Sequence, residues 1–324
     1  MLPLENRLEL KSKIPVCWII GKGGLLGNNL LKQVLLYQYE IFNGSDSFTW
    51  ANEELLKKQF QLSVAQFFKV ANGRKWIIYW AAGSGRMNST ETSMDVEIKI
   101  LSYFVNYLQC ESDRILKNGV FVFSSSAGAI YGGSKDYPIS ERSSTACVNA
   151  YGRGKLKQES IITSLARDGK GATVLIYRLS TLYGVKQENH VEHGLLSTLS
   201  RSIYRKQLIH IYVPLDTMRD FISADDAAKI IIKDVACVEL SSIIQIKIIA
   251  SETSTSIARI LTIFKAISNC KPLIVTSANF WGHAYQNNLV YKSDYPSLKR
   301  EVKTKSLEIG IAEILSAESL RANL

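Results

Sequence analysis

The chain has 324 residues, of which 46% are hydrophobic and 21% are charged, so it can bury a large core and is neither disordered nor fibrous. Its formal net charge of +10 attracts anions, but the lysines and arginines form no tract, which argues against a nucleic-acid partner. No apolar run approaches the roughly 20 residues that span a bilayer, and the amino-terminal segment is charged, so we expect a cytosolic protein without a membrane partner.

Short apolar runs alternate with amphipathic segments through the first half of the chain. Runs typical of buried strands lie at residues 15–20, 40–42, 76–80, 119–124 and 172–179. Apolar residues at helical spacing lie at residues 25–37, 52–70, 91–109 and 149–168. This alternation predicts an α/β fold with a doubly wound parallel sheet that helices cover on both faces.

The second half of the chain is less regular. We predict helices at residues 194–206, 225–237 and 254–268, and strands at residues 210–213, 243–250 and 273–276. We therefore divide the chain into a first domain of residues 1–178 and a smaller carboxy-terminal part of residues 179–324. Some segments of the second part, at about 211–250, are expected to return to the main sheet.

A glycine-rich loop joins the first predicted strand to the first predicted helix. Its glycines follow a G-x-x-G-x-x-G pattern, in which the backbone can turn sharply and approach a pyrophosphate closely, beside the positive end of a helix. The loop predicts a Rossmann-type domain that binds NAD or NADP through Gly21, Lys22, Gly24, Leu25, Leu26 and Gly27. A turn that merely packs the helix tightly on the sheet is the structural alternative.

The sequence indicates the choice between NAD and NADP less clearly than it indicates dinucleotide binding. An acidic residue about 20 positions after the loop would bind the ribose hydroxyls, and Asp46 is the only candidate. Lys22 stands beside the first glycine, where a cation can meet a 2′-phosphate, and this favours NADP slightly. An exposed lysine without a ligand is the alternative.

Tyr151 and Lys155 form a Y-x-x-x-K pattern at the start of a predicted helix. Residues four apart lie on one face of a helix, one turn apart. A neighbouring ammonium favours the phenolate and lowers the pKa of a tyrosine, which then exchanges a proton with a substrate hydroxyl. The run Ser124-Ser125-Ser126 comes at the carboxyl edge of the fourth strand, where such sheets bind ligands. A surface helix with a chance Y-x-x-x-K pair is the alternative.

The order of these motifs resembles the extended short-chain dehydrogenase/reductases, the NAD-dependent epimerase/dehydratase family. Four further segments resemble signatures of that family: FVFSSSAGAIYG at 121–132, PISE at 138–141, RLSTLYG at 178–184 and RDFISADDAA at 219–228. The resemblance implies a smaller carboxy-terminal part that binds a nucleotide-diphosphate sugar.

The resemblance also implies roles for single residues. Tyr151 is the catalytic acid/base, and Lys155 lowers its pKa and holds the cofactor's ribose. Ser126 is the catalytic hydroxyl that orients the substrate; Ser125 is its rival, because the following loop is one residue longer than in many members. Substrate binding is thus expected from Ser125, Ser126, Thr181 and Arg219. The segment around Arg219 also contains a helix capping box at residues 223–226, so it can be structural instead.

Three departures from the family pattern bear on the reaction. Ala127 and Gly128 stand where sugar dehydratases carry an Asp-Glu pair, which argues against dehydration. Glu97 replaces a usual asparagine, and Thr181 stands where epimerases often have asparagine. We expect a nucleotide-sugar epimerase that transiently oxidises the sugar C4. The alternatives are an NAD(P)H-dependent 4-ketoreductase and a non-catalytic dinucleotide-binding regulatory or scaffold protein.

The remaining expectations concern partners and metals. Members of the family suggest a homodimer formed by helices 91–109 and 149–168, and the apolar face of Ile98, Leu101, Val105 and Leu108 is compatible with it or with core packing. The pair His190 and His193 has no evident third ligand, so no metal site is expected. The five scattered cysteines are expected to be buried free thiols.

Overall fold

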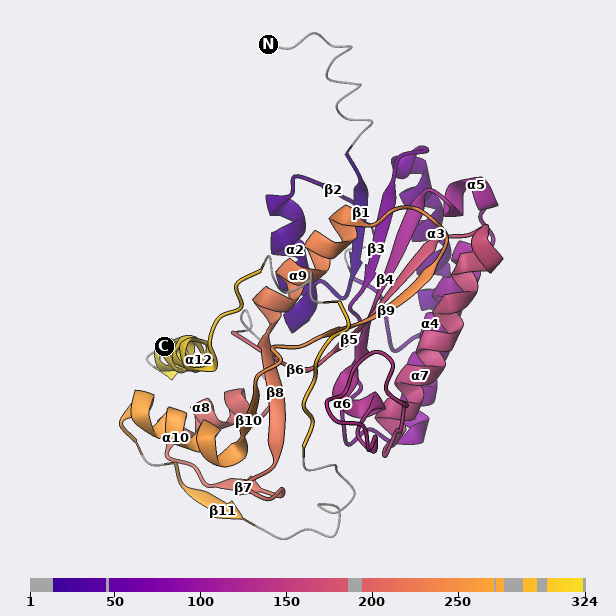
Figure 1. The fold of residues 1–324 in the computed structure, drawn as a ribbon. Helices are drawn as coiled ribbons and strands as arrows, with labels where there is room; N and C mark the ends of the chain where they lie inside the picture. The colour runs from indigo at the N-terminus through magenta and orange to yellow at the C-terminus, as the bar shows by residue number, and fades with distance from the viewer. Residues whose placement is uncertain are drawn as a thin grey trace. The chain divides into compact units, whose positions relative to one another are not determined.

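The computed structural model describes residues 14–44, 47–185, 194–270, 272–276, 288–295 and 302–322 (Figure 1). The chain divides into two compact units, and each unit is assembled from three separate stretches of sequence. Unit 1 comprises Met1–Ser125, Asn149–Tyr177 and Ile231–Ile246. Unit 2 comprises Ser126–Val148, Arg178–Ile230 and Lys247–Leu324.

The main sheet has six strands in the order β2-β1-β3-β4-β5-β9. Their bounds are β1 Val16–Ile20, β2 Glu40–Ile41, β3 Trp76–Trp80, β4 Gly119–Ser126, β5 Thr173–Leu179 and β9 Ile244–Ile249. Pairing is parallel from β2 to β4, with Val16 opposite both Glu40 and Trp76, and Trp76 opposite Gly119. The predicted α/β parallel sheet of Rossmann type is confirmed. The strand order reverses between β1 and β3, and doubly wound sheets bind their ligands at the carboxyl ends of the strands at such a reversal.

Helices cover both faces of the sheet in unit 1 (Figure 1). They are α2 Leu25–Leu36, α3 Glu53–Ala71, α4 Glu91–Gln109 and α7 Ala150–Thr163. Side chains of α3 and α4 pack on the sheet face that carries Trp18, Trp80 and Phe123. The contacts are mostly edge-to-face, as in Phe60 against Phe104 at 5.2 Å between ring centroids. This aromatic core fixes the strand ends on which the candidate site is built.

Helix α7 is shorter than the sequence predicts. It ends at Thr163 and continues as a 3-10 turn over Ser164–Gly169, because Arg167 and Asp168 adopt left-handed backbone conformations. Gly154 in this helix lies directly against α4: a Cβ there would come within 2.9 Å of the Met94 Cβ. The close approach of two helices therefore accounts for a glycine that weakens α7 on its own.

Among the described residues of unit 2, two small sheets and the helices α8, α10 and α12 contribute to a second core. One sheet has the order β10-β8-β6, and the other pairs β11 with β7. The strands are β6 Thr181–Tyr183, β7 Ile209–Ile211, β8 Met218–Ser223, β10 Ser254–Ser256 and β11 Ile274–Thr276. The helices are α8 Leu195–Arg205, α10 Ile257–Ser268 and α12 Leu307–Ala322. Helix α9, Ala224–Cys237, begins in unit 2 and ends in unit 1.

Several elements differ from the sequence expectation. The helix predicted at 254–268 begins only at Ile257, because Ser254–Ser256 pair with β8 and Ser256 then caps the helix. The short helices α5 Asp113–Leu116 and α6 Ala127–Ile130 were not predicted, nor was α12. Cys110, Cys237 and Cys270 are exposed, so the expectation of buried thiols is wrong for these three. Within the described ranges, no helix combines the length and apolar character needed to cross a bilayer.

Candidate active site

The glycine loop begins at the carboxyl end of β1, beside the chain that leaves β3. Gly21 has φ +93°, and a Cβ there would lie 2.6 Å from both the Ala81 carbonyl carbon and the Ala82 nitrogen. No other residue fits this position without parting the two loops. The loop therefore lies at the reversal of strand order, where doubly wound sheets bind their ligands.

The next two glycines bring the start of α2 onto Gly21. The Gly24 N–H donates to the Gly21 carbonyl at 2.9 Å, and a Cβ on Gly27 would lie 2.1 Å from the same oxygen. Gly24 caps α2 without a side-chain hydrogen bond, and the first turn carries no acidic residue. Leu25 opens the helix, Leu26 is buried and Lys22 is half-buried in the turn. Unpaired N–H groups at the positive end of a helix fit the pyrophosphate of a dinucleotide.

The end of β2 is the region where a ribose-binding acid is sought. Phe42 follows the strand and is buried edge-on to Trp18, with ring centroids 5.2 Å apart. Asn43 and Gly44 come next, so no carboxylate occurs in this part of the described chain. Asp46, the candidate from the sequence, lies outside the described residues, as do His190 and His193.

Tyr151 and Lys155 lie at the start of α7, as the spacing predicts. Asn149 caps this helix by accepting a 2.8 Å hydrogen bond from the Gly152 N–H. The half-buried Tyr151 ring has its centroid 5.8 Å from the Lys155 Nζ. Lys155 is buried, and its ammonium donates to the Ser124 carbonyl at 3.3 Å. The pair is thus held against the end of β4.

Two carboxylates act on the buried ammonium. Burial lowers the pKa of Lys155, whereas the charges of Glu97 and Glu159 raise it. Glu159 is itself buried, and its Oε1 accepts a 2.5 Å hydrogen bond from the Ser125 hydroxyl. The sequence analysis missed Glu159. Its spacing of four residues after Lys155 was the available signal, because residues at this spacing share a helix face.

The two candidate serines have different neighbours. Ser125 is buried in unit 1 and bonded to Glu159. Ser126 is half-buried at the start of unit 2, and its hydroxyl accepts from the Ala129 N–H at 3.4 Å, capping α6. Among the hydrogen bonds described, the Ser125 hydroxyl donates its proton to a carboxylate, whereas the Ser126 hydroxyl does not.

Thr181 and Arg219 lie on neighbouring strands of unit 2. Thr181 is exposed in β6 opposite Phe221 of β8, and half-buried Arg219 precedes Phe221 by two residues. The Arg219 guanidinium donates to the Met218 carbonyl at 2.8 Å. Its charge lowers the pKa of buried Tyr291, although burial raises that pKa more strongly. The positive charge of Arg219 thus acts on a buried phenol.

The segment around Arg219 also has the structural role that its capping pattern suggested. Ser223 accepts a 3.0 Å hydrogen bond from the Asp226 N–H at the start of α9. Asp220 is buried and accepts from the Ser251 N–H, the Ser251 hydroxyl and the Thr253 N–H at 2.8–3.1 Å. Burial raises the pKa of Asp220, and these donors oppose the rise.

Glu141, in the P-x-x-E turn, connects three parts of unit 2. One oxygen accepts from the Ile248 N–H at 2.7 Å and the Ser293 hydroxyl at 2.6 Å. The other accepts from the Asp294 N–H at 2.7 Å. The sequence analysis gave this glutamate no role, since its partners are more than 100 residues away along the chain.

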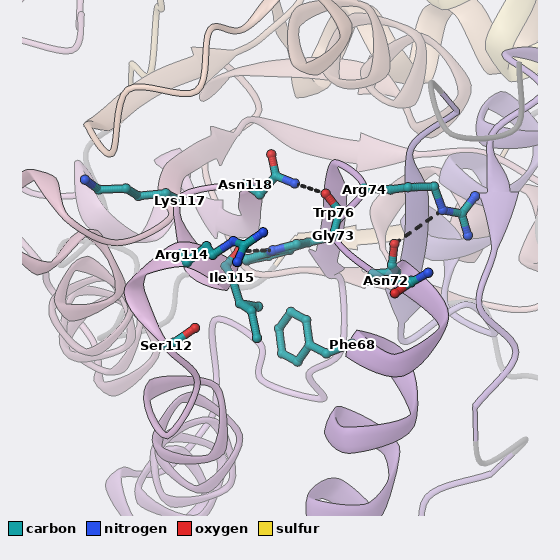
Figure 2. Close-up of a pocket in the computed structure, with 11 residues that line it drawn as sticks. Phe68, Asn72, Gly73, Arg74, Trp76, Ser112, Arg114, Ile115, Lys117 and Asn118 are labelled. Carbon is teal, nitrogen blue, oxygen red and sulfur yellow. Dashed lines mark hydrogen bonds between the residues drawn. The ribbon is translucent and has the colours of Figure 1, made fainter. Parts of the chain in front are cut away.

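A separate pocket lies at the amino ends of β3 and β4 (Figure 2). Its wall includes Phe68, Trp76 and Arg114, and the Trp76 indole N–H donates to the Ile115 carbonyl at 2.8 Å. The side chain of Asn118 bonds to the Gly73 carbonyl there. Parallel sheets of this type bind ligands at the opposite, carboxyl ends of their strands. We therefore place the candidate active site at Gly21 and Tyr151, not in this pocket.

Comparison with known proteins identifies the family to which the chain belongs. Residues 17–238 match the family described as "NAD dependent epimerase/dehydratase family". A protein of Methanocaldococcus jannaschii described as "Putative UDP-glucose 4-epimerase" is 26% identical over 219 residues, which span 65% of this chain and 70% of that protein.

Two solved structures have the same fold. The UDP-glucose 4-epimerase of Thermotoga maritima, solved with UDP-glucose, is 17% identical and covers 96% of this chain and 99% of its own, with a TM-score of 0.73. The UDP-glucose 4-epimerase of Thermus thermophilus, solved with NAD, is 14% identical and covers 94% and 99%, with a TM-score of 0.74. The resemblance drawn from the motifs is confirmed: the chain belongs to the NAD-dependent epimerase/dehydratase family and is an NAD(P)-dependent enzyme of the extended short-chain dehydrogenase/reductase type.

Proposed function

We propose that the enzyme is a nucleotide-sugar epimerase that acts by transient oxidation at the sugar C4. The observation that carries the proposal is the Tyr151–Lys155 pair, one helical turn apart at the end of β4, in the same unit as the glycine loop after β1. The loop and the pair both lie at the carboxyl edge of the main sheet, which supports roles in dinucleotide binding and proton transfer. Such an edge is where redox chemistry on a bound alcohol can occur.

The chain's own residues supply the cofactor site. Gly21, Gly24 and Gly27 let the loop, the chain after β3 and the start of α2 pack closely together, and N–H groups at the start of α2 would be available to a pyrophosphate. A dinucleotide held there would supply a nicotinamide ring as a reversible hydride acceptor. Lys22 is the cation next to this cradle, and we propose that it favours NADP over NAD.

We propose that Tyr151 transfers the proton. Its phenolate takes the proton of the C4 hydroxyl and later returns it. Lys155 carries the positive charge that stabilises this phenolate and binds the ribose through its ammonium. We assign the orienting hydroxyl to Ser126, since Ser125 is buried and bonded to Glu159.

The nucleotide sugar is proposed to bind through unit 2. The Arg219 guanidinium presents a planar fork of donors suited to a diphosphate, and exposed Thr181 lies on the neighbouring strand. Ala127 and Gly128, in α6, carry no acid that could expel water from the sugar, which supports epimerisation over dehydration. The UDP-glucose bound to the Thermotoga maritima enzyme suggests a UDP-sugar as the first substrate to test.

The experiment begins with mass spectrometry of the purified protein for retained dinucleotide. A screen of UDP-, GDP-, dTDP- and CDP-sugars follows, with the Tyr151→Phe variant as the control. Interconversion of two C4 epimers at a constant level of reduced cofactor supports the proposal. Stoichiometric consumption of NAD(P)H with a 4-keto sugar would instead identify the 4-ketoreductase, our second candidate. A parent protein that turns over no nucleotide sugar, and whose function Tyr151→Phe leaves unchanged, would contradict both.

A further inference from the structure

Strands β7 and β11 form a two-stranded sheet in unit 2 whose two faces are covered differently (Figure 1). Ile209 pairs with Ile274 in parallel register, and the face that carries Ile209 and Ile211 packs in the second core with α8 and α10. Parallel sheets are almost always covered on both faces. The opposite face of this sheet is exposed in the structure, which calls for an explanation.

The exposed face is apolar and aromatic. Because side chains alternate along a strand, Leu208, His210 and Tyr212 line this face from β7 and its flanks, and Leu273 and Val275 line it from β11 and its flank. Apart from His210, these side chains are 38–54% exposed. The His210 and Tyr212 rings stack with their centroids 6.0 Å apart. These five residues form what we call the β7–β11 face, and an exposed apolar patch of this kind marks a binding surface.

The chain around this face carries charge of one sign. No aspartate or glutamate occurs in residues 193–215 or in residues 253–293, the two stretches that contain α8 with β7 and α10 with β11. The first acidic residue after β7 is Asp216. The same two stretches carry seven lysines and arginines, whereas the whole chain has a net charge of +10. A basic part of the surface attracts an anionic partner.

Three of these cations lie at the helix ends that lead into the two strands. Arg205 is in the last turn of α8, Lys206 caps that helix, and Lys265 is in the last turn of α10. Because β7 and β11 run parallel, both helices lead into the same, amino edge of the sheet, where the Ile209 N–H donates to the Leu273 carbonyl at 2.9 Å. The three cationic side chains are exposed, and within the described ranges they form no ion pair.

An anionic bilayer surface fits this combination better than a protein or a nucleic acid does. A second copy bound face to face would bring the same cations, with no acidic side chain from these stretches to pair with them. Nucleic acid rewards the charge but not the aliphatic side chains. Tyrosine, lysine and arginine have an apolar body and a polar tip, which suits the headgroup region of a membrane. A flat sheet face can meet a bilayer without the groove that a peptide needs.

We propose that the β7–β11 face binds the surface of an anionic bilayer. Its apolar side chains enter the boundary between headgroups and acyl chains, while Arg205, Lys206 and Lys265 bind lipid phosphates. The sequence argued against a membrane partner because it has no apolar run long enough to span a bilayer, but a contact of this kind needs none. The proposal does not depend on the reaction that the enzyme catalyses.

The first test is co-sedimentation of the full-length protein with vesicles. Vesicles of phosphatidylcholine with about 30% phosphatidylglycerol are compared with vesicles of phosphatidylcholine alone. At low salt we expect about fivefold more protein on the anionic vesicles, and we expect about 0.5 M salt to reduce the difference. Equal binding to both vesicles, or no binding to either, overturns the proposal.

Paired variants test which surface makes the contact. Leu208→Ser/Leu273→Ser is expected to lower binding to anionic vesicles about fivefold. Its matched control is Leu35→Ser/Leu36→Ser, at two leucines of α2 that are 58% and 72% exposed. The control is expected to change binding less than twofold. An equal loss in the control would mean that binding is not specific to this face, and the proposal fails.

Charge reversal is the second pair. Arg205→Glu/Lys206→Glu is expected to lower binding about fivefold, because each cation near an anionic surface contributes to the attraction. Lys32→Glu/Lys69→Glu makes the same change of net charge at exposed lysines of α2 and α3 and is expected to have a smaller effect. Equal losses in the two variants would show attraction by net charge alone and would overturn the proposal.

A dye on Cys270 tests the contact with the face unaltered. Cys270 is exposed between α10 and β11, and Cys110 is exposed at the end of α4 in unit 1. The environment-sensitive dye NBD is attached to one of these thiols, with the other cysteines outside the core replaced by serine. Anionic vesicles are expected to brighten and blue-shift NBD on Cys270 but not on Cys110. The reverse result overturns the proposal. So does a dimer in light scattering that Leu208→Ser/Leu273→Ser abolishes while no vesicle is bound, because a second copy would then be the partner.

Discussion

Ser125 and Ser126 are neighbours in the chain but differ in what their hydroxyls can do. The Ser125 hydroxyl is buried and donates to the Glu159 carboxylate at 2.5 Å. The half-buried Ser126 hydroxyl accepts a weaker bond, 3.4 Å long, from a backbone N–H. One serine therefore stabilises the fold around Lys155, and the other is available to a substrate.

Alanine substitution should separate the two serines. Ser126→Ala is expected to lower kcat about 100-fold with little change in the free energy of unfolding, because it removes a hydroxyl that orients the reacting oxygen. Ser125→Ala is expected to lower that free energy by about 1–3 kcal/mol, since Glu159 loses its donor. Steady-state kinetics and urea unfolding measure the two effects. The reverse pattern would make Ser125 the catalytic hydroxyl.

The cysteines are expected to differ in reactivity because they differ in burial. Burial raises the pKa of the Cys17 thiol far above its usual range, whereas Cys110, Cys237 and Cys270 are exposed. Because the thiolate is the reactive form, Ellman's reagent is expected to label the exposed three quickly and Cys17 only after unfolding. Peptide mass spectrometry after a short pulse identifies the labelled sites. Fast labelling of Cys17 in the folded protein would contradict this description of β1.

For single residues, the sequence predicts those whose chemistry depends on a short spacing along the chain. The glycine loop and the Tyr151–Lys155 turn are local patterns, and helix and turn geometry fix them. The partners of Lys155 were not predictable in the same way. Glu97 comes from another helix, and Ser124 reaches the ammonium through a carbonyl that no side-chain pattern reveals. Such contacts depend on strand register and helix packing.

Helices α4 and α7 together carry the candidate site in unit 1, and their spacing depends on one glycine. Glu97 lies on α4 and Lys155 on α7, so the distance between the helices sets how strongly the two charges interact. Gly154 permits the close approach, since a Cβ there would contact Met94 at 2.7–3.1 Å. Packing between elements thus overrides the low helix propensity of glycine.

Gly154→Ala is expected to destabilise the protein although alanine is the better helix former. The added methyl forces α4 and α7 apart and should lower the free energy of unfolding by about 1–3 kcal/mol, more than the roughly 1 kcal/mol gained in propensity. Urea unfolding measures the change. The double variant Met94→Ala/Gly154→Ala, which makes room for the methyl, is expected to recover much of the loss. A more stable Gly154→Ala single variant would mean that the helices are not in close contact.

Elements with a clear apolar period were predicted, and those without one were missed. Strands β1 and β3 are continuous apolar runs, and α3 has one buried stripe with Asn52 and Asn72 at its ends. Helix α12 has apolar residues around most of its circumference, so no stripe marks it as a helix. Strands β6 and β10 have three residues each, too few to show an alternation.

At the scale of the whole molecule, the chain passes repeatedly between the two units. Strand β4 ends in unit 2, and β5 and β9 also have their last residues there. The sixth strand of the sheet, β9, follows the first two stretches of unit 2 in the sequence. Residue 178 is the predicted boundary between the two domains. A chain that ends there nevertheless lacks β9, a strand of the main sheet.

A fragment of residues 1–178 is expected to aggregate. Without β9, the buried strand β5 becomes an edge with unpaired N–H and C=O groups and apolar side chains, which invites pairing between molecules. A fragment of residues 1–250, which restores β9, is expected to give more soluble monomer on size-exclusion chromatography. Equal solubility of the two fragments would mean that β9 is dispensable to the sheet.

The homodimer expected from the family stays a prediction, and the structure narrows which residues could form it. Leu101, Val105 and Leu108 of α4 are fully or almost fully buried in the core of unit 1. They are therefore unavailable to a partner. Val96 on the same helix is 54% exposed, so Val96→Lys is the variant that should convert a dimer to a monomer in light scattering.

The late position of β9 has a consequence for synthesis on the ribosome. Seventy residues separate the end of β5 at Leu179 from the end of β9 at Ile249 (249 − 179). During synthesis at about 5–20 residues per second, the edge of β5 that pairs with β9 therefore has no partner strand for roughly 4–14 seconds. Chaperones that hold nascent chains have that interval in which to act. We expect the yield of folded enzyme to depend on how fast this stretch is translated, more than on the stability of the finished protein.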